Sequence, residues 1–416
     1  MKKPLCFYLL AFFTIGFSFR AQADTAFIYG KVSTFLGDTY VGQIRWGDEE
    51  AFWTDRFNAN KVYNDNIDFL SDSEILQLKK EKQMYSLEER KEWSDNQIQN
   101  DKSEYTFLHQ FSCQFGEIKT MKLTRWQKAE LILRDGSKVT VSGTNTNDMN
   151  MPITIYDGAG GKIKIEWMEI SQIEFLKEPG QFKSAIGEPL YGTVYTSDGP
   201  ISGTIEWDRD ERVTSDELDG KHRTGKFKAA FAKIKAIQPH KSGSLVTMES
   251  GERVYVFGTN DVNSKNRGII VTNDEIGHVN VNWENFERVE FLTKKKSGKG
   301  YSQFKKPSEI TGKVKMKDGK SLRGKIVFDL DEQFDYEVLN GATGKMMYEI
   351  PFRNIKRILP HGDSNCTVEL KTQKKIKLRD SQDVSFKNEG LLVFENTNST
   401  NPIYISWREV EEVVFN

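Results

Sequence analysis

The chain has 416 residues, of which 29% are charged and 12% aromatic, and its formal net charge is −1. This length suggests several domains, and the balanced charge argues against a polyanion-binding protein, which would be more basic. Only 3 cysteines occur, without a CxxC pair or a metal-type Cys/His spacing, so neither a disulfide framework nor a zinc site is indicated.

The first 23 residues have the pattern of a targeting segment. Lys2 and Lys3 precede an apolar run over residues 4–19, and an Ala-Gln-Ala cleavage pattern follows at 21–23. The run is too short to span a bilayer comfortably, and no other stretch approaches that length. We therefore expect a signal peptide cleaved after Ala23 and a periplasmic or secreted protein without a membrane span.

One pattern then occurs three times, over residues 24–176 (repeat 1), 190–292 (repeat 2) and 309–416 (repeat 3). Each repeat has a front half with a hairpin, an aromatic residue and an acidic turn, and a back half that ends in a strand after a tryptophan. The aromatic residue and acidic turn are Trp46 to Glu50, Trp207 to Glu211 and Phe328 to Glu332. Internal repetition of this kind indicates a repeat architecture.

The residues alternate between apolar and polar, which is typical of β-strands. In repeat 3 this alternation continues on both sides of Asp318-Gly319, a hairpin signature. A unit of about fifty residues buries too little surface to be stable alone. We therefore predict an all-β protein in which each repeat is a pair of small barrels, with the recurring tryptophans in the cores.

Repeat 1 contains an insertion, roughly residues 64–104, that the other repeats lack. Ser71-Asp-Ser-Glu74 is a capping box, and the composition from Ile75 to about Ile98 favours a helix. Its narrow apolar face would contain Ile75, Leu78 and either Met84 or Tyr85. Two interpretations remain open, a helix that packs over one barrel and a helix that binds a partner.

Two linkers, 177–189 and 293–308, separate the repeats, because Gly, Pro and charge occur there without periodicity. Each contains Gln-Phe-Lys, and we expect Phe182 and Phe304 to dock onto a neighbouring repeat. The lysines at 294–296 either belong to a solvated linker or meet an acidic surface.

The acidic turns are the sharpest candidate site. Calcium takes six to eight oxygen ligands on a flexible loop, and carboxylates recur at this turn in all three repeats. The alternative is a solvated hairpin end that protects the sheet, and no other cofactor is indicated. The candidate metal ligands are Asp208, Asp210, Glu211 and Asp216 in repeat 2 and Asp329, Asp331, Glu332 and Glu337 in repeat 3.

A second polar cluster follows Gly258. Asn and Asp side chains often bond to their own backbone in tight loops, and the alternative is a contact with a glycan or peptide. The candidate partner-binding residues are Asn260, Asp261, Asn263 and Asn266.

The front halves resemble the Sm-like family of small SH3-type barrels. Residues 314–329 of repeat 3 look like the first motif of that family, and residues 350–358 look like its second. The resemblance implies a five-stranded barrel. It does not imply RNA binding, because the Asn expected after Asp329 is absent and the Arg-Gly of the second motif is Arg353-Asn354. The whole pattern also resembles uncharacterised exported bacterial repeat proteins.

No nucleophile, base and orienting group assemble in the sequence, so we do not expect an enzyme. Cys113 and Cys366 are left either as free thiols or as a pair. The resulting hypothesis is an exported, non-enzymatic β-repeat protein of the bacterial envelope that binds a protein or glycan partner through its loops. The alternative is a calcium-stabilised adhesion or scaffold module that uses the acidic turns.

Overall fold

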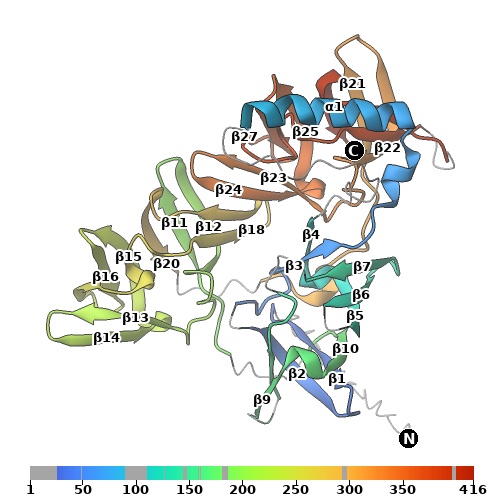
Figure 1. The fold of residues 1–416 in the computed structure, drawn as a ribbon. Helices are drawn as coiled ribbons and strands as arrows, with labels where there is room; N and C mark the ends of the chain where they lie inside the picture. The colour runs from blue at the N-terminus through green and yellow to red at the C-terminus, as the bar shows by residue number, and fades with distance from the viewer. Residues whose placement is uncertain are drawn as a thin grey trace, which may run out of the picture.

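A computed structural model describes residues 26–47, 49–89, 110–125, 127–143, 148–157, 159, 161–179, 186–292, 298–395 and 400–416. Within these ranges the chain consists mainly of antiparallel strands, with a single α-helix, α1 (Asp72–Glu89) (Figure 1). The predicted all-β class is confirmed. The expected signal peptide and its cleavage site lie outside the described residues. None of the described helices has the length and apolar character needed to cross a bilayer.

Ten described strands belong to each repeat. In repeat 1 they are β1 (Tyr29–Thr34), β2 (Thr39–Trp46), β3 (Arg56–Lys61), β4 (Gln110–Gln114), β5 (Ile118–Arg125), β6 (Lys128–Leu133), β7 (Lys138–Ser142), β8 (Ile153–Tyr156), β9 (Lys162–Ile165) and β10 (Ile170–Phe175). In repeat 2 they are β11 (Tyr191–Thr196), β12 (Gly199–Glu206), β13 (Glu217–His222), β14 (Gly225–Ala230), β15 (Ile234–His240), β16 (Gly243–Met248), β17 (Arg253–Phe257), β18 (Ile269–Asn273), β19 (Gly277–Val281) and β20 (Phe286–Phe291). In repeat 3 they are β21 (Thr311–Met316), β22 (Ser321–Phe328), β23 (Val338–Thr343), β24 (Met346–Pro351), β25 (Ile355–His361), β26 (Asn365–Leu370), β27 (Lys375–Arg379), β28 (Leu391–Phe394), β29 (Ile403–Ile405) and β30 (Val410–Phe415).

Short 3-10 turns connect several of these strands. They are η1 (Asp65–Phe69), η3 (Phe115–Glu117), η4 (Trp167–Glu169), η5 (Phe231–Lys233), η6 (Asn260–Val262), η7 (Tyr301–Gln303), η8 (Phe352–Asn354) and η9 (Trp407–Glu409).

The strands of the two sequence halves interleave in every repeat. In repeat 1, β1 pairs with β10, β2 with β8 and β3 with β7, and the equivalent pairs recur in repeat 2 and repeat 3. We had expected the front and back halves to close as two separate barrels, and this expectation is wrong. Strands β3 to β7 instead form one group, inserted between β2 and β8. Alternation predicts which residues face inward but not which distant strand is the partner.

Repeats 2 and 3 are joined by main-chain pairing. Strand β19 runs antiparallel to β24, with Val279 opposite Tyr348, and the buried apolar residues of both repeats form one continuous cluster. The two repeats therefore share a core and a sheet.

Repeat 1 contacts both other repeats. Phe52 packs with Val213 of repeat 2. On the other side, the linker before repeat 3 buries Tyr301 and Phe304 in the core of repeat 1, where the Tyr301 hydroxyl donates to the Ile118 carbonyl at 3.0 Å. The predicted docking of Phe304 is confirmed, whereas Phe182 lies outside the described residues.

Helix α1 leaves repeat 1 and packs on repeat 3 (Figure 1). The capping box is present, because the Ser71 amide donates to the Glu74 carboxylate at 2.7 Å. Leu78 and Ile75 contact a cluster that includes Leu330 and Leu392 of repeat 3. The expected packing is therefore confirmed, with the sheet of a different repeat as the surface. The side chains of Met84 and Tyr85 lie outside the described part of the helix.

The tryptophans occupy the cores, as predicted. Trp46 and Trp207 are fully buried, Trp167 and Trp407 nearly so, and Trp283 packs against the shared core of repeats 2 and 3 while partly buried. Cys113 and Cys366 are both buried free thiols.

Candidate functional site: the acidic turns

The three acidic turns have the same backbone framework. Each turn follows an aromatic residue at the end of β2 or β22 or directly after β12. A left-handed backbone then reverses the chain, at φ 52° for Asp208 and 50° for Asp329. The amide of the aromatic residue donates across the turn, from Trp207 to the Glu211 carbonyl at 2.9 Å and from Phe328 to the Glu332 carbonyl at 2.9 Å. This turn directs the carboxylates that follow the aromatic residue toward one another.

Two of the predicted ligands, Asp216 and Glu337, have a structural role instead. Asp216 accepts the amides of Arg212 and Val213 at 2.7 and 3.0 Å, and it pairs with Arg45 of repeat 1 at 2.8 Å. Glu337 likewise accepts the amides of Gln333 and Phe334. These carboxylates cap the backbone after the turn.

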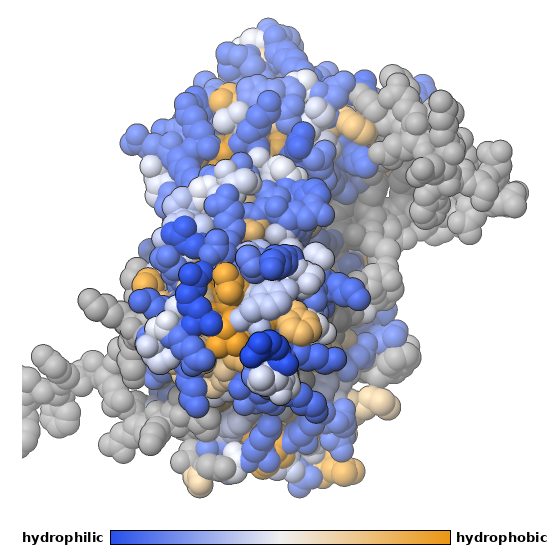
Figure 2. Space-filling view, turned by 90° about the vertical axis from the view of Figure 1, so that its left-hand side faces the viewer, coloured by the Kyte–Doolittle hydropathy of each residue, from blue (hydrophilic) through white to orange (hydrophobic). Residues whose placement is uncertain are grey.

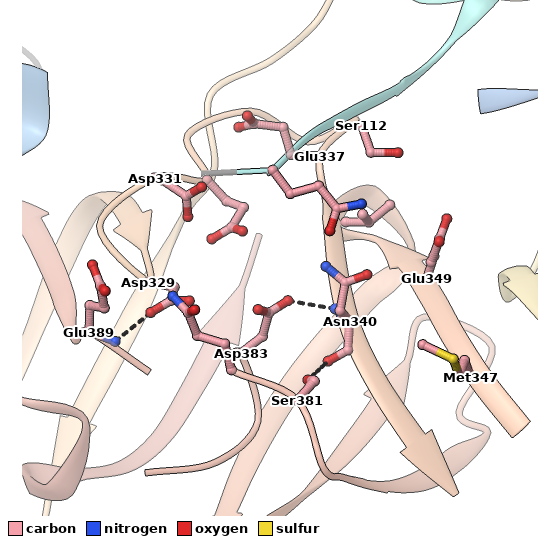
Figure 3. Close-up of a pocket in the computed structure, with 14 residues that line it drawn as sticks. Ser112, Asp329, Asp331, Glu337, Asn340, Met347, Glu349, Ser381, Asp383 and Glu389 are labelled. Carbon is pink, nitrogen blue, oxygen red and sulfur yellow. Dashed lines mark hydrogen bonds between the residues drawn. The ribbon is translucent and has the colours of Figure 1, made fainter. Parts of the chain in front are cut away.

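In repeat 3 the turn carboxylates converge. Asp329, Asp331 and Glu332 are all buried, and a carboxylate oxygen from each lies within 4.8 Å of the others. They line a cavity of about 460 Å³ together with Asp383 and Glu389 (Figure 3). None of the described residues that line this cavity is a lysine or an arginine. The described part of the inner wall is therefore acidic and contains no basic side chain.

Lys61 of repeat 1 lies at the outer margin of this cluster. Lys61 Nζ donates to Glu337 Oε1 at 2.6 Å and to the Asp331 carbonyl at 2.5 Å, and it lies 4.0 Å from Asp331 Oδ2. It thus pairs with the capping carboxylate rather than with Asp329 or Glu332.

Burial makes the charged form of these carboxylates unfavourable. It raises the pKa of Asp329 and of Glu332 well above their usual range, and neighbouring carboxylates add to both effects. Burial likewise raises the pKa of Asp383 to about 7. Glu332 Oε2 is buried and has no hydrogen-bond partner among the described residues. A buried charge requires a partner or a proton, so the cluster is suited to a bound cation.

Repeat 2 carries its own cation at the matching position. The Arg267 amide donates to Asp208 Oδ1 at 2.5 Å, and its guanidinium lies 3.0 Å from Asp208 Oδ2 and 2.5 Å from Asp210 Oδ2. In repeat 3 the Glu389 amide makes the same hydrogen bond, to Asp329 Oδ1. The residue that contributes a guanidinium in repeat 2 therefore contributes a further carboxylate in repeat 3.

Glu211, the remaining candidate of repeat 2, lies beside this ion pair. Burial raises its pKa to about 11, and the hydrogen bond with Asp210 and nearby carboxylates add to the shift. In repeat 2 the turn aspartates therefore have an arginine of their own repeat as a partner.

Repeat 1 brings together Glu49, Glu50 and Asp148. They lie on a cavity of about 370 Å³ where the three repeats meet, and Arg56, Arg209 and Arg267 also line this cavity. Basic side chains are therefore already present at the junction.

The loop after strand seven of each repeat contributes an aspartate that we did not predict as a ligand. Asp148, Asp261 and Asp383 each accept the amide of a residue on the third strand, at 2.5, 2.7 and 2.5 Å. Their recurrence at one place in the three repeats is the sequence signal that could have found them.

The predicted partner-binding residues mainly hold their own loop. Asn260 donates to Asp208, and Asp261 accepts the Asp219 amide. The Asn263 and Asn266 side chains accept the amides of Lys265 and Gly268, at 2.8 and 3.0 Å. All four side chains thus have a partner within repeat 2.

Comparisons with protein families, with curated proteins and with solved structures find no match to this chain.

Proposed function

We propose that the protein is a non-enzymatic, calcium-stabilised scaffold module of the bacterial envelope, in which the acidic turn of repeat 3 holds the ion. The observation that supports this proposal is the buried cluster of Asp329, Asp331 and Glu332, in which Glu332 Oε2 has no partner. The matching turn of repeat 2 carries a guanidinium at the same place. The positive charge at this position in repeat 2 supports a bound cation at the equivalent position in repeat 3.

Calcium suits this site better than magnesium. Ca²⁺ accepts six to eight oxygens in flexible geometry, whereas Mg²⁺ demands a tight octahedron and retains its waters. Seven carboxylates line the cavity, five of them besides the backbone-capping Glu337 and the outer Glu349, and the cavity also has room for water. The residues that would hold the ion are Asp329, Asp331, Glu332, Asp383 and Glu389. Bound there, calcium would supply positive charge to a turn that is otherwise strongly repulsive.

The position of the site makes its role structural. Gln110 and Ser112 of β4 in repeat 1 form part of the same cavity wall, and Lys61 binds its margin. Binding of the ion would therefore strengthen the contact between repeats 1 and 3. Burial raises the pKa of the Cys113 thiol well above its usual value and that of Cys366 to about 12, so neither is suited to act as a nucleophile.

Isothermal titration calorimetry of the chain with Ca²⁺ tests the proposal. We expect one site that is lost in Glu332→Gln and retained in Asp363→Asn, which removes an exposed carboxylate of the same repeat. The Kd for Mg²⁺ should be at least about tenfold higher than the Kd for Ca²⁺. Equal binding by the wild type and Glu332→Gln would show that calcium does not use this cavity.

A further inference from the structure

A face of repeat 2 differs from its counterparts in the other repeats by its aromatic residues. Leu245 on β16 lies opposite Tyr255 on β17, and Gly243 lies opposite Phe257. The Tyr255 and Phe257 rings stack, with centroids 5.6 Å apart, and His240 meets Tyr255 edge-on at 5.8 Å. Their side chains are half-buried or exposed. We call His240, Leu245, Tyr255 and Phe257 the aromatic face.

The fold does not require this face. At the positions equivalent to Leu245 and Tyr255, repeat 1 has Glu130 opposite Thr140. Repeat 3 has Thr367 opposite Lys377. Ser142 and Arg379 stand where repeat 2 has Phe257. Two sheets with the same pairing order thus carry polar side chains at these positions. A cluster of partly exposed aromatic rings that the fold does not require indicates an interaction site.

Two basic turns flank Phe257. Lys221 lies opposite it on β13, and the hairpin that follows contains Arg223 and Lys226. The turn between β15 and β16 adds Lys241 on the side of Gly243. Neither turn, 221–226 or 240–243, contains an acidic residue, and these four basic residues are exposed. Figure 2, which shows the side of the molecule where repeat 2 lies, displays an apolar strip surrounded by hydrophilic residues.

We propose that the aromatic face of repeat 2 binds an anionic polysaccharide. The aromatic rings would pack against the apolar faces of the sugar rings, while the Tyr255 hydroxyl and His240 offer hydrogen bonds to sugar hydroxyls. The four basic side chains complement carboxylates spaced along the polymer.

The spacing of these charges favours a glycan over a nucleic acid. Strong binding to nucleic acid rests on many phosphate contacts along a dense charge array, whereas here four cations lie on two separate turns. The formal net charge of the whole chain is −1, so the chain as a whole lacks the positive charge typical of nucleic-acid-binding proteins. A polysaccharide with one carboxylate every one or two sugars matches that sparse pattern.

Titration of the full chain with hyaluronate, followed by calorimetry, tests this inference. Carboxyl-reduced neutral hyaluronate and a single-stranded DNA oligonucleotide serve as comparison ligands. Tyr255→Thr combined with Phe257→Ser introduces the residues that repeat 1 carries at these positions, so the sheet is expected to fold. Lys221→Gln with Lys226→Gln removes two exposed charges, and Phe35→Ser is a matched control at an exposed aromatic residue elsewhere.

We expect hyaluronate to bind with a Kd below about 1 mM. The neutral polymer should bind at least about tenfold more weakly, and both double variants should lose about tenfold or more, while Phe35→Ser changes nothing. Absence of binding, equal binding of the neutral polymer, or unchanged binding by either double variant would overturn the inference. Tighter binding of the oligonucleotide than of hyaluronate would also overturn it and would assign the face to nucleic acid.

Discussion

At the residue scale, one exchanged side chain distinguishes the acidic turns of repeats 2 and 3. The amides of Arg267 and Glu389 make the same hydrogen bond to the first aspartate of the turn. The arginine then neutralises Asp208 and Asp210, whereas the glutamate adds a carboxylate beside Asp329. The proposed calcium site in repeat 3 rests on this difference in charge at one position.

Exchanging these side chains is expected to exchange the dependence on calcium. Glu389→Arg should place a guanidinium over Asp329 and stabilise the chain in EDTA by about 1.5–3 kcal/mol, the range for charge-assisted hydrogen bonds. Its stability should no longer respond to Ca²⁺. The reciprocal Arg267→Glu should be less stable in EDTA and should gain a calcium response. Urea unfolding in EDTA and in Ca²⁺ measures both effects, and a Glu389→Arg variant that keeps the full response would contradict the assignment.

His278 makes the contact between repeats 1 and 2 sensitive to pH. It is buried on β19, and its Nε2 lies 3.1 Å from the Thr54 carbonyl of repeat 1. Burial, assisted by Arg56, lowers its pKa to about 3. The folded state thus holds the neutral ring, while the unfolded chain takes up a proton near pH 6.5.

Stability contributed by this neutral ring is complete above pH 6.5 and falls as the pH drops toward 3. At pH 5 the loss for this group is about 2 kcal/mol. His278→Gln keeps a hydrogen-bond donor without titrating, so its unfolding free energy should fall less between pH 7.5 and 5 than that of the wild type. Urea unfolding at the two pH values gives the difference, and identical pH dependence of the two proteins would refute the role of His278.

At the scale of the element, α1 connects two repeats. It belongs to repeat 1 in sequence and packs on repeat 3. Leu78 is buried against the face of β22 and β28, whereas Leu76 of the same helix is 52% exposed. Most helical stability in proteins comes from packing of an apolar face rather than from propensity. Its order therefore depends on the apolar residues that it meets.

Replacing each of these two leucines by alanine distinguishes the contribution of packing to stability from that of helix propensity. Leu78→Ala is expected to lower the free energy of unfolding by about 2–3 kcal/mol through loss of buried surface, and Leu76→Ala by less than about 0.5 kcal/mol. Chemical denaturation of the two variants measures the difference. Equal effects would mean that α1 does not hold repeat 3 in solution.

At the scale of the whole molecule, the sequence predicts some levels of structure and not others. The alternation around Asp318-Gly319 and the buried tryptophans are local signals, so the all-β class followed from them. The pairing of β2 with β8 is not local, and alternation cannot specify it, so the halves of each repeat were wrongly assigned to separate barrels. The sequence did contain an indication that α1 packs on repeat 3. Repeat 3 has the apolar residues Val327 and Leu330 where repeat 2 has the charged residues Glu206 and Arg209.

The candidate site was predictable only in part, because the sequence shows local patterns but not contacts between distant residues. Recurrence of carboxylates after the aromatic residue identified the turn, and three of the four residues proposed in repeat 3 line its buried cluster. The carboxylates of Asp383 and Glu389 come from a loop more than fifty residues away, and only the fold brings them to the turn. The role of Glu337 as a backbone cap depends on turn geometry that composition does not encode.

Thermal unfolding of the chain in EDTA and in millimolar Ca²⁺ tests the central claim most directly. At about 100 times its Kd, a ligand that binds only the folded state stabilises it by about 2.7 kcal/mol, which raises Tm by roughly 3 °C if the whole chain unfolds as one cooperative unit. We expect this increase in the wild type and in Asp363→Asn, and its loss in Glu332→Gln. An equal Tm of the wild type with and without Ca²⁺ would contradict the calcium site.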